Sequence, residues 1–334
     1  MARDGVQGLV SVVVASYNHA EFLARRMESL LDQTYVPMEI LVIDDCSTDR
    51  SVEVLRRYGS QPRVKLVLRE RNGGWVAVSN QGIEMATGEY ILLANCDDAC
   101  DPRMIERLVG SISQEPNIGV SFCRSTMIDD KDRILGDDFE VRERGFRTRC
   151  AADTKIGRDE MNRFLLHSCV IPNLSAALIR RRCFEVVGGL SDEYRACSDW
   201  EFFFRVASQF DFAYVAEPLN RFRQHPTTIR SAMKGRATLE EFLRLLLGRI
   251  GAIDLTALER LRYRVHAMYL WSIHLLSPRL QGLKDFPFHA KKVLSLDPAS
   301  FFLLLPALMW RVVIVGGKFV ASLLPQRTRM SENV

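Results

Sequence analysis

The chain has 334 residues and a formal net charge of +4, from 45 basic and 41 acidic residues. This small positive surplus does not indicate nucleic acid as a partner, and 47% hydrophobic against 26% charged residues excludes a disordered chain. At this length we expect one large domain with an appendage, or two domains, built around a sizeable core.

The eight cysteines predict reduced thiols that are mostly buried as small hydrophobic residues. They stand at positions 46, 96, 100, 123, 150, 169, 183 and 197, without a C-x-x-C pair or a second Cys/His pair at zinc-finger spacing. The amino-terminal segment MARDGVQGLVSVVVASYN lacks the basic region, apolar region and cleavage site of a secretory signal. We therefore interpret its short apolar run as a buried strand and expect a cytoplasmic protein.

Strands and helices alternate through the first hundred residues. The pattern predicts strands over 9–15, 39–43, 64–68 and 90–94, and helices over 20–33, 51–58 and 75–86. Apolar, β-branched strands between amphipathic helices indicate an α/β, Rossmann-like fold with a largely parallel sheet covered on both faces. Right-handed crossovers bring the carboxyl ends of such strands to one edge, which is where ligands of these sheets bind.

The rest of the chain divides into a less regular middle, which includes an amphipathic helix from about Ser198, and a helical pattern from Thr238 onward. We predict a nucleotide-binding catalytic domain over 1–232 and an α-helical extension over 233–334. The apolar stretch at about 300–325 is interrupted by Pro306, Arg311 and Lys318, so it is a poor spanning helix. Two interpretations stay open, an interfacial segment at the inner face of the plasma membrane or packing on the catalytic domain or a second subunit.

Polar segments follow three of the four predicted strands. They are Ser16-Tyr17-Asn18-His19, the stretch from Asp44 to Asp49, and Asn95-Cys96-Asp97-Asp98. Because the strands are expected to be parallel, the topology places all three segments at one edge of the sheet. This convergence is the main indication of a site, since it depends on no single residue.

The pair Asp97-Asp98 can supply oxygen ligands to Mg²⁺ or Mn²⁺. Alone the pair is weak, because most such pairs are solvated loop charges or caps, but its position after the apolar strand EYILLA strengthens it. The pair Asp44-Asp45 also ends a strand. Ser47 or Asp49 is expected to cap the next helix, but such a cap does not explain why two aspartates, Asp44 and Asp45, stand at the end of the strand.

Five ordered segments carry a resemblance to a known family: SVVVASYNHAEFL, EILVIDDCSTD, GEYILLANCDD, NLSAALIRRRCFEVVGGLSDEY and SDWEFFFRVA. In this order they resemble family-2 inverting glycosyltransferases of the GT-A fold, over about residues 10–231. The resemblance implies transfer of a sugar from a nucleotide-diphosphate sugar to a hydroxyl acceptor. It also implies Mn²⁺ or Mg²⁺ as cofactor and a place in surface or lipid-linked polysaccharide synthesis.

The resemblance assigns donor-binding roles to five positions. Ala15 and Tyr17 match the loop that contacts the nucleobase, and Asp45 matches the carboxylate that bonds the base. That carboxylate can accept a hydrogen bond from a ring N–H, as a uracil would offer. Arg223 and His225 match a late R-x-H segment that closes over the diphosphate.

The resemblance also assigns the metal site and the base. Asp97 matches the acidic residue near the ribose and the metal, Asp98 a direct metal ligand, and Asp199 the general base. A cation would neutralise the leaving diphosphate, and a carboxylate opposite it would take the proton from the acceptor hydroxyl. A charge that favours the helix amino terminus is the other interpretation of Asp199.

Three positions depart from the family pattern and keep alternatives open. Asn95 replaces the first acid of a D-x-D motif, Ser79 replaces an arginine, and Ser198 replaces the acid before the base. A catalytically degenerate nucleotide-binding or partner-binding domain is therefore the main alternative. A sugar-1-phosphate nucleotidyltransferase is disfavoured, because the loop after the first strand lacks glycine.

Overall fold

The computed structural model describes residues 5–225, 236–275 and 281–309, which we call the described residues. By its contacts the chain divides into two compact units, Met1–Ala232 and Met233–Val334. The roles predicted for the segments 1–232 and 233–334 stay predictions.

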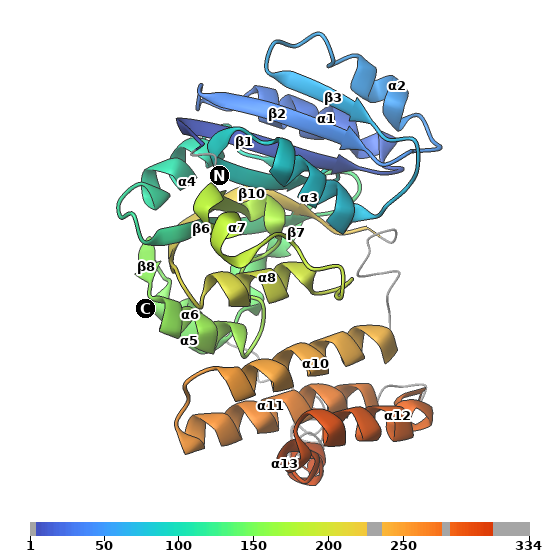
Figure 1. Cartoon of the computed structure of the whole chain (residues 1–334), viewed down its shortest axis with the longest axis vertical. Helices are drawn as coiled ribbons and strands as arrows, with labels where there is room; N and C mark the ends of the chain where they lie inside the picture. The colour runs from blue at the N-terminus through green and yellow to red at the C-terminus, as the bar shows by residue number, and fades with distance from the viewer. Residues whose placement is uncertain (1–4, 226–235, 276–280, 310–334) are drawn as a thin grey trace, which may run out of the picture. The chain divides into compact units, whose positions relative to one another are not determined.

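The first unit is built on a mixed sheet (Figure 1) in the order β3-β2-β1-β4-β9-β6-β10-β5, with β7 paired to β6 and β8 to β10. The strands run over Val6–Ser16 (β1), Met38–Asp44 (β2), Val64–Leu68 (β3), Gly88–Asn95 (β4), Ala99–Cys100 (β5), Ile118–Ile128 (β6), Ile134–Asp137 (β7), Thr154–Ile156 (β8), Ala177–Arg180 (β9) and Asp211–Arg223 (β10). The helices run over Ala20–Leu31 (α1), Ser51–Arg56 (α2), Trp75–Met85 (α3), Met104–Ile112 (α4), Arg144–Arg149 (α5), Arg158–Leu165 (α6), Arg181–Val187 (α7) and Ser198–Val206 (α8).

The four strands predicted from the sequence are present and parallel to one another in the order β3, β2, β1, β4. Beyond them the sheet changes direction, because β9 lies antiparallel between β4 and β6. The sequence pattern did not predict β6, β9 or β10. In β10 the register against β6 shifts around Pro218, which has no N–H to donate to the ladder, so the strand lacks a regular alternation.

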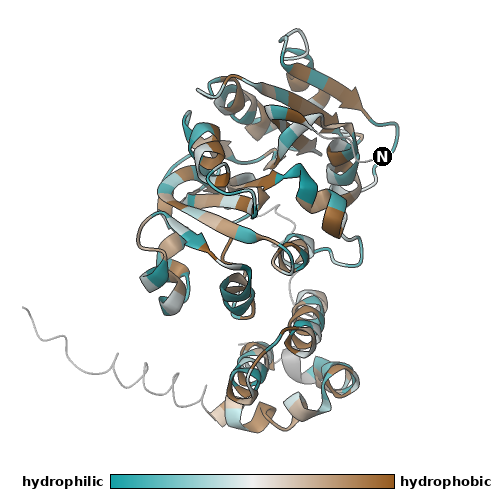
Figure 2. Ribbon diagram, turned by 60° about the vertical axis from the view of Figure 1, so that its left-hand side comes forward, coloured by the Kyte–Doolittle hydropathy of each residue, from teal (hydrophilic) through white to brown (hydrophobic). Residues whose placement is uncertain are grey.

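The core lies on both faces of β1. Val10, Val12 and Val14 pack in one cluster with residues of α1 and α4. On the other face Val13 meets Gly82 of α3, where an added Cβ would lie 2.1 Å from Val13 Cγ1. Figure 2 shows these strands as hydrophobic ribbon inside the unit. The close contact of α3 with β1 and the apolar packing on both faces of β1 fix the position of the strand end. The polar loop that follows β1 begins at this end.

The second unit contains Arg236–Ala252 (α10), Ala257–Leu275 (α11), Gln281–Leu296 (α12) and Pro298–Phe301 (α13). Helix α11 begins with a capping box, in which the backbone N–H of Thr256 donates to Glu259 and that of Glu259 donates to Thr256 Oγ1. Arg264 of α11 donates twice to Asp297, which precedes α13. These contacts fix the start of α11 and join α11 to the start of α13 within the second unit.

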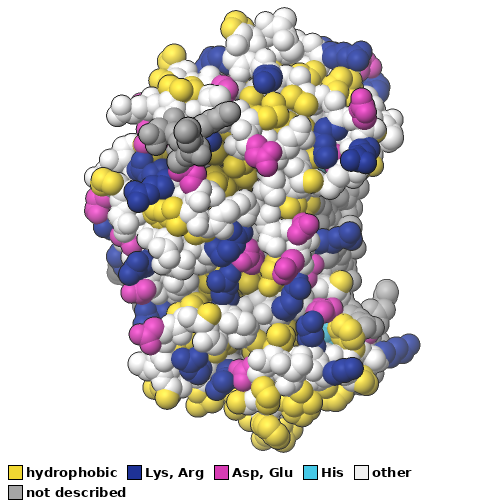
Figure 3. Space-filling view, in the orientation of Figure 1, with side chains coloured by type: hydrophobic (Ala, Val, Ile, Leu, Met, Phe, Trp, Pro, Cys, Tyr) yellow, Lys and Arg dark blue, Asp and Glu magenta, His cyan; other side chains and the backbone are white. Residues whose placement is uncertain are grey.

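Hydrophobic side chains gather at the α13 end of this unit (Figure 3), where Phe302, Leu305 and Met309 are exposed. Within the described ranges no helix is long and apolar enough to cross a membrane. Most of the predicted apolar tail, from residue 310 onward, lies outside the described residues.

Candidate active site

The three polar segments lie at one edge of the sheet, as the parallel topology predicts. Ser16 is in register with Asp44 of β2, and Ala15 with Asn95 of β4. The backbone N–H of Asp45 continues the pairing by donating to the Ser16 carbonyl at 2.8 Å. The carboxyl ends of β1, β2 and β4 therefore form one continuous polar edge.

Asp45 is buried at this edge and holds the turn that follows β3. Its carboxylate accepts from Arg69 Nη1 at 2.6 Å and from the backbone N–H groups of Gly73 and Gly74 at 2.9 and 2.8 Å. Gly74 has φ +84°, a conformation that glycine adopts without strain. Tyr17 directly follows Ser16, whose carbonyl accepts from the backbone N–H of Asp45, and it is 42% exposed. Asp45 thus holds the turn after β3 in place, and Tyr17 offers an exposed aromatic ring at the same edge of the sheet.

Asp44 and Asp49 are used in local structure. Asp44 accepts from the backbone N–H and the hydroxyl of Ser47. Asp49 accepts from the backbone N–H groups of Ala20 and Ser51, the first residues of α1 and α2. The N-cap position of α2 is Arg50, so Asp49 satisfies the first N–H of that helix from one residue before the cap.

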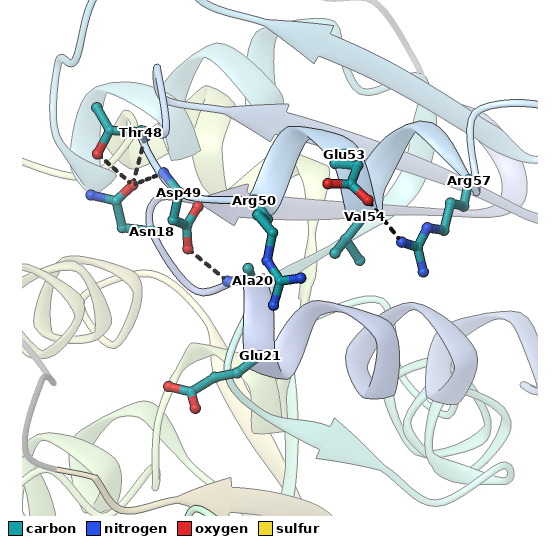
Figure 4. A pocket seen from close by; sticks show the side chains of 9 residues that line it. All are labelled: Asn18, Ala20, Glu21, Thr48, Asp49, Arg50, Glu53, Val54 and Arg57. Atoms are coloured by element: carbon teal, nitrogen blue, oxygen red, sulfur yellow. Dashed lines mark hydrogen bonds and ion pairs between the residues drawn. The ribbon is translucent and has the colours of Figure 1, made fainter.

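A pocket of about 610 Å³ opens beside this cap (Figure 4). It is lined by Asn18, Ala20, Glu21, Thr48, Asp49, Arg50, Glu53, Val54 and Arg57. Figure 4 shows Asn18 bonded to Thr48, Asp49 bonded to Ala20 and Glu53 paired with Arg57. Part of the polar lining is therefore bonded within the pocket wall itself, and we assign the pocket no role.

The structure brings Asp97 together with two histidines. Asp97 Oδ2 lies 2.9 Å from His225 Nε2, and ligand atoms of His19, Asp97 and His225 all lie within 4.8 Å of one another. His19 follows β1 and His225 follows β10, so segments 200 residues apart meet beside the end of β4. Two imidazoles and a carboxylate are donors that fit a divalent transition-metal ion such as Mn²⁺.

The electrostatics of this cluster favour the charged form of the Asp97 carboxylate. Burial alone would raise the pKa of Asp97, but the hydrogen bond from His225 and the charge of His19 lower it below its usual range. Burial lowers the pKa of His19, with Asp97 opposing that effect. His19 was not predicted as a ligand; its place in the polar segment after the first strand was the available signal.

Asp98 has a different environment from its neighbour. Its side chain is 1% exposed and accepts from the backbone N–H of Arg223 at 2.9 Å, Asn173 Nδ2 at 2.7 Å and Asn95 Nδ2 at 3.3 Å. Burial and the nearby charge of Asp97 raise the pKa of Asp98 to about 7. Asn95 donates to Asp98, and its own backbone N–H donates to Ser175 at 2.9 Å. Asp98 therefore joins β4 to β10 inside the protein.

Arg223, predicted to close over a diphosphate, is buried and bonded within the chain. Its Nε donates to the Asp97 carbonyl at 2.7 Å, and its Nη atoms donate to the Asp129 carbonyl and to Asp132, each at 2.5 Å. Its guanidinium lies over the ring of Phe22. In this structure Arg223 therefore holds the loop that carries Asp97.

Asp199 lies in the first turn of α8, where the macrodipole favours a carboxylate. The preceding Ser198 is buried and donates to the Ser191 carbonyl at 2.7 Å. Glu201, two residues after Asp199 on the same helix, is paired with Arg205, which also donates to the Gly189 carbonyl. These bonds fix the start of α8, and the role of Asp199 as a base stays a prediction.

Comparison with known proteins identifies the family. The model of glycosyl transferase family 2 matches residues 11–188, more than half of the chain. A protein of Sinorhizobium fredii described as uncharacterized, y4gI, is 32% identical over 259 residues, which are 72% of this chain and 26% of that relative. The chain thus spans about a quarter of the length of this curated relative.

Two solved structures share the fold. TarS 1–349 of S. aureus in complex with UDP-GlcNAc has a TM-score of 0.64 at 17% identity, covering 89% of this chain and 84% of that one. The mannosyltransferase PcManGT of Pyrobaculum calidifontis, in complex with GDP-Man and Mn²⁺, has a TM-score of 0.54 at 15% identity, covering 90% and 87%. The predicted fold class is confirmed. The chain therefore belongs to glycosyl transferase family 2, and it consists of a GT-A domain and a C-terminal helical unit.

Proposed function

We propose that the chain transfers a sugar from a nucleotide-diphosphate donor to a hydroxyl acceptor with inversion at the anomeric carbon. The observation that carries the proposal is the grouping of Asp97 with His19 and His225 at the edge that also holds Asp45 and Tyr17. A set of metal-ligating side chains at the carboxyl ends of parallel strands, beside a polar and aromatic surface, is what a nucleotide-sugar transferase requires.

The donor would lie along the carboxyl ends of β1, β2 and β4. We assign the nucleobase to the surface formed by Ala15, exposed Tyr17 and the turn that Asp45 holds. TarS and PcManGT were solved with UDP-GlcNAc and GDP-Man, which supports a nucleotide sugar as donor class. The acceptor class that we propose, a surface or lipid-linked glycan, follows from the family resemblance.

We assign the metal to Asp97, His225 and His19, and this revises the sequence-based expectation that Asp98 is the direct ligand. Asp98 has three donors on its two oxygens, whereas the side chain of Asp97 is 18% exposed and faces both histidines. A bound divalent cation would supply positive charge for the leaving diphosphate. Of the two expected ions, the pair of imidazoles favours Mn²⁺ over Mg²⁺, which prefers oxygen ligands. Arg223 would act by holding the backbone of the Asp97 loop and not by touching the donor.

Asp199 is our candidate for the general base. At the amino terminus of α8 it would accept the proton of the acceptor hydroxyl as that oxygen attacks opposite the leaving diphosphate. The fixed turn before α8 would keep its carboxylate in place during a single displacement.

The test is transfer and donor hydrolysis with purified chain, Mn²⁺ and a panel of nucleotide sugars. With the matching donor we expect slow release of nucleoside diphosphate that requires the metal. Asp199→Asn should lower the transfer rate by at least about 100-fold while donor binding, measured by thermal shift, is retained. Asp192→Asn, in the exposed loop before α8, is the matched control. Unchanged transfer by Asp199→Asn would remove it as the base.

A degenerate nucleotide-binding domain is the second candidate. The amide of Asn95 is directed to Asp98, and the acceptor positions of Asp45 are occupied within the chain. The same assay separates the two candidates, because a degenerate domain would show a donor-induced thermal shift without release of nucleoside diphosphate.

A further inference from the structure

A second group of metal-ligating side chains lies in the helical unit. His274 is close to the carboxyl end of α11, and Asp285 and His289 are on α12. Ligand atoms of all three lie within 4.8 Å of one another, and the two helices are in contact (Figure 1). Asp285 and His289 are four residues apart on one helix, so they share a face.

The spacing of His274 and Asp285 fits two ligands of one ion. His274 Nε2 lies 3.6 Å from Asp285 Oδ2, which is too long for a hydrogen bond. This nitrogen is buried and has no hydrogen-bond partner among the described residues. Two ligands of a tetrahedral ion with bonds of about 2.0–2.1 Å lie about 3.4 Å apart. A shared ion would therefore satisfy a buried nitrogen that costs free energy without a partner.

The surroundings favour tight binding. Trp271 is fully buried, packs edge-on against His289 and stacks on Phe286 with ring centroids 5.5 Å apart. An apolar wall of this kind holds the ligands in place and lowers competition from water. Two imidazoles among three ligands favour Zn²⁺ over Mg²⁺ or Ca²⁺, which prefer oxygen ligands.

We propose that His274, Asp285 and His289 bind one Zn²⁺ ion that joins α11 to α12. The fourth position is open to water. The site belongs to the helical unit alone and is independent of the sugar-transfer reaction. Its expected effect is to stabilise the helix pair, since an ion that binds only the folded unit raises its stability.

The test uses the full chain, stripped with EDTA and titrated with Zn²⁺ against a chromophoric chelator. All variants carry His225→Gln, so that the cluster around Asp97 does not contribute. We expect one zinc ion per chain in this background. Adding His274→Gln or Asp285→Asn should weaken binding by on the order of 100-fold or more, because even outer residues of zinc sites contribute about 10–100-fold. The side chains of both residues are partly exposed, at 15% and 23%, so the fold should survive the changes.

His266→Gln, on α11 but outside the cluster, is the matched control and should bind zinc like the background. Zinc should raise the melting temperature of the background chain and of the control, and not that of the His274→Gln chain. Equal zinc affinity in the presence and absence of His274→Gln would overturn the proposal. So would an equal rise in melting temperature in both chains.

Discussion

Asp97 and Asp98 are neighbours in sequence whose side chains face different environments. Asp97 faces His19 and His225, whereas Asp98 accepts hydrogen bonds from Arg223 and Asn173. Both residues lie in the turn between β4 and β5, where the Asp97 side chain faces the two histidines and the Asp98 side chain is buried in the protein. The two aspartates differ in the direction of their side chains, and a sequence of two identical residues does not predict that direction.

Asparagine substitutions separate the two roles. Asp97→Asn keeps an oxygen for His225 and should change the free energy of unfolding by less than about 1 kcal/mol, while Mn²⁺ affinity falls at least about tenfold. Asp98→Asn points an amide at a donor and should destabilise by about 1–3 kcal/mol. Because its pKa is about 7, this cost depends on hydrogen bonds more than on charge.

Urea unfolding and metal titration of both variants measure these effects. The fully buried guanidinium of Arg26, whose charge acts on Asp98, adds to the cost of the Asp98 change. Loss of metal binding in a stably folded Asp98→Asn chain, with Asp97→Asn unaffected, would return the ligand role to Asp98.

Among the elements, those with a strong local pattern were predictable. Strands β1 to β4 are continuous apolar runs, and the structure places their ends within a few residues of the predicted ones. By contrast β9 has only four residues, and the register of β10 against β6 shifts at Pro218, so the positions of both strands depend on pairing partners far away in sequence.

The same limit applies to the site. The shared edge followed from parallel topology, and so did the approach of Asp45 to the loop after β1. The meeting of His19 with His225 depends on where β10 ends relative to β4, and no local pattern encodes that. The loop bonds of Arg223 likewise involve residues 129 and 132, which only the folded β6–β7 turn brings close.

The contact of α3 with β1 provides a test at the level of elements. Gly82→Ala would place a Cβ 2.1 Å from Val13 Cγ1, in a buried face that has no room to adjust. We expect a loss of about 1–3 kcal/mol in the free energy of unfolding, because overpacking forces strain on both elements.

Gly110→Ala is the matched control, since it lies in α4 with no atom within 4 Å of an added Cβ. Alanine there should stabilise by about 0.5–1 kcal/mol through helix propensity. Chemical unfolding of both variants gives the comparison. If Gly82→Ala proved as stable as Gly110→Ala, α3 could not pack on β1 as closely as described.

All eight cysteines lie among the described residues, where none forms a disulfide, and six of them are buried. Burial raises the pKa of Cys150 and Cys183 to about 12, and that of Cys96 and Cys123 further. The thiolate is the reactive form of cysteine. Burial therefore lowers the reactivity of these four thiols in two ways, because it blocks access of the reagent and keeps the thiol protonated.

Thiol counting with a chromogenic disulfide therefore tests the packing of the whole first unit. In the native chain two thiols, namely the partly exposed Cys46 and Cys169, should react rapidly and release two equivalents of chromophore. In the denatured chain all eight thiols should react. Cys46→Ser should reduce the rapid count to one and leave the slow count unchanged. A third rapid thiol in the native chain would mean that part of the core opens on the time scale of the assay, because a buried thiol reacts only when its surroundings unfold locally.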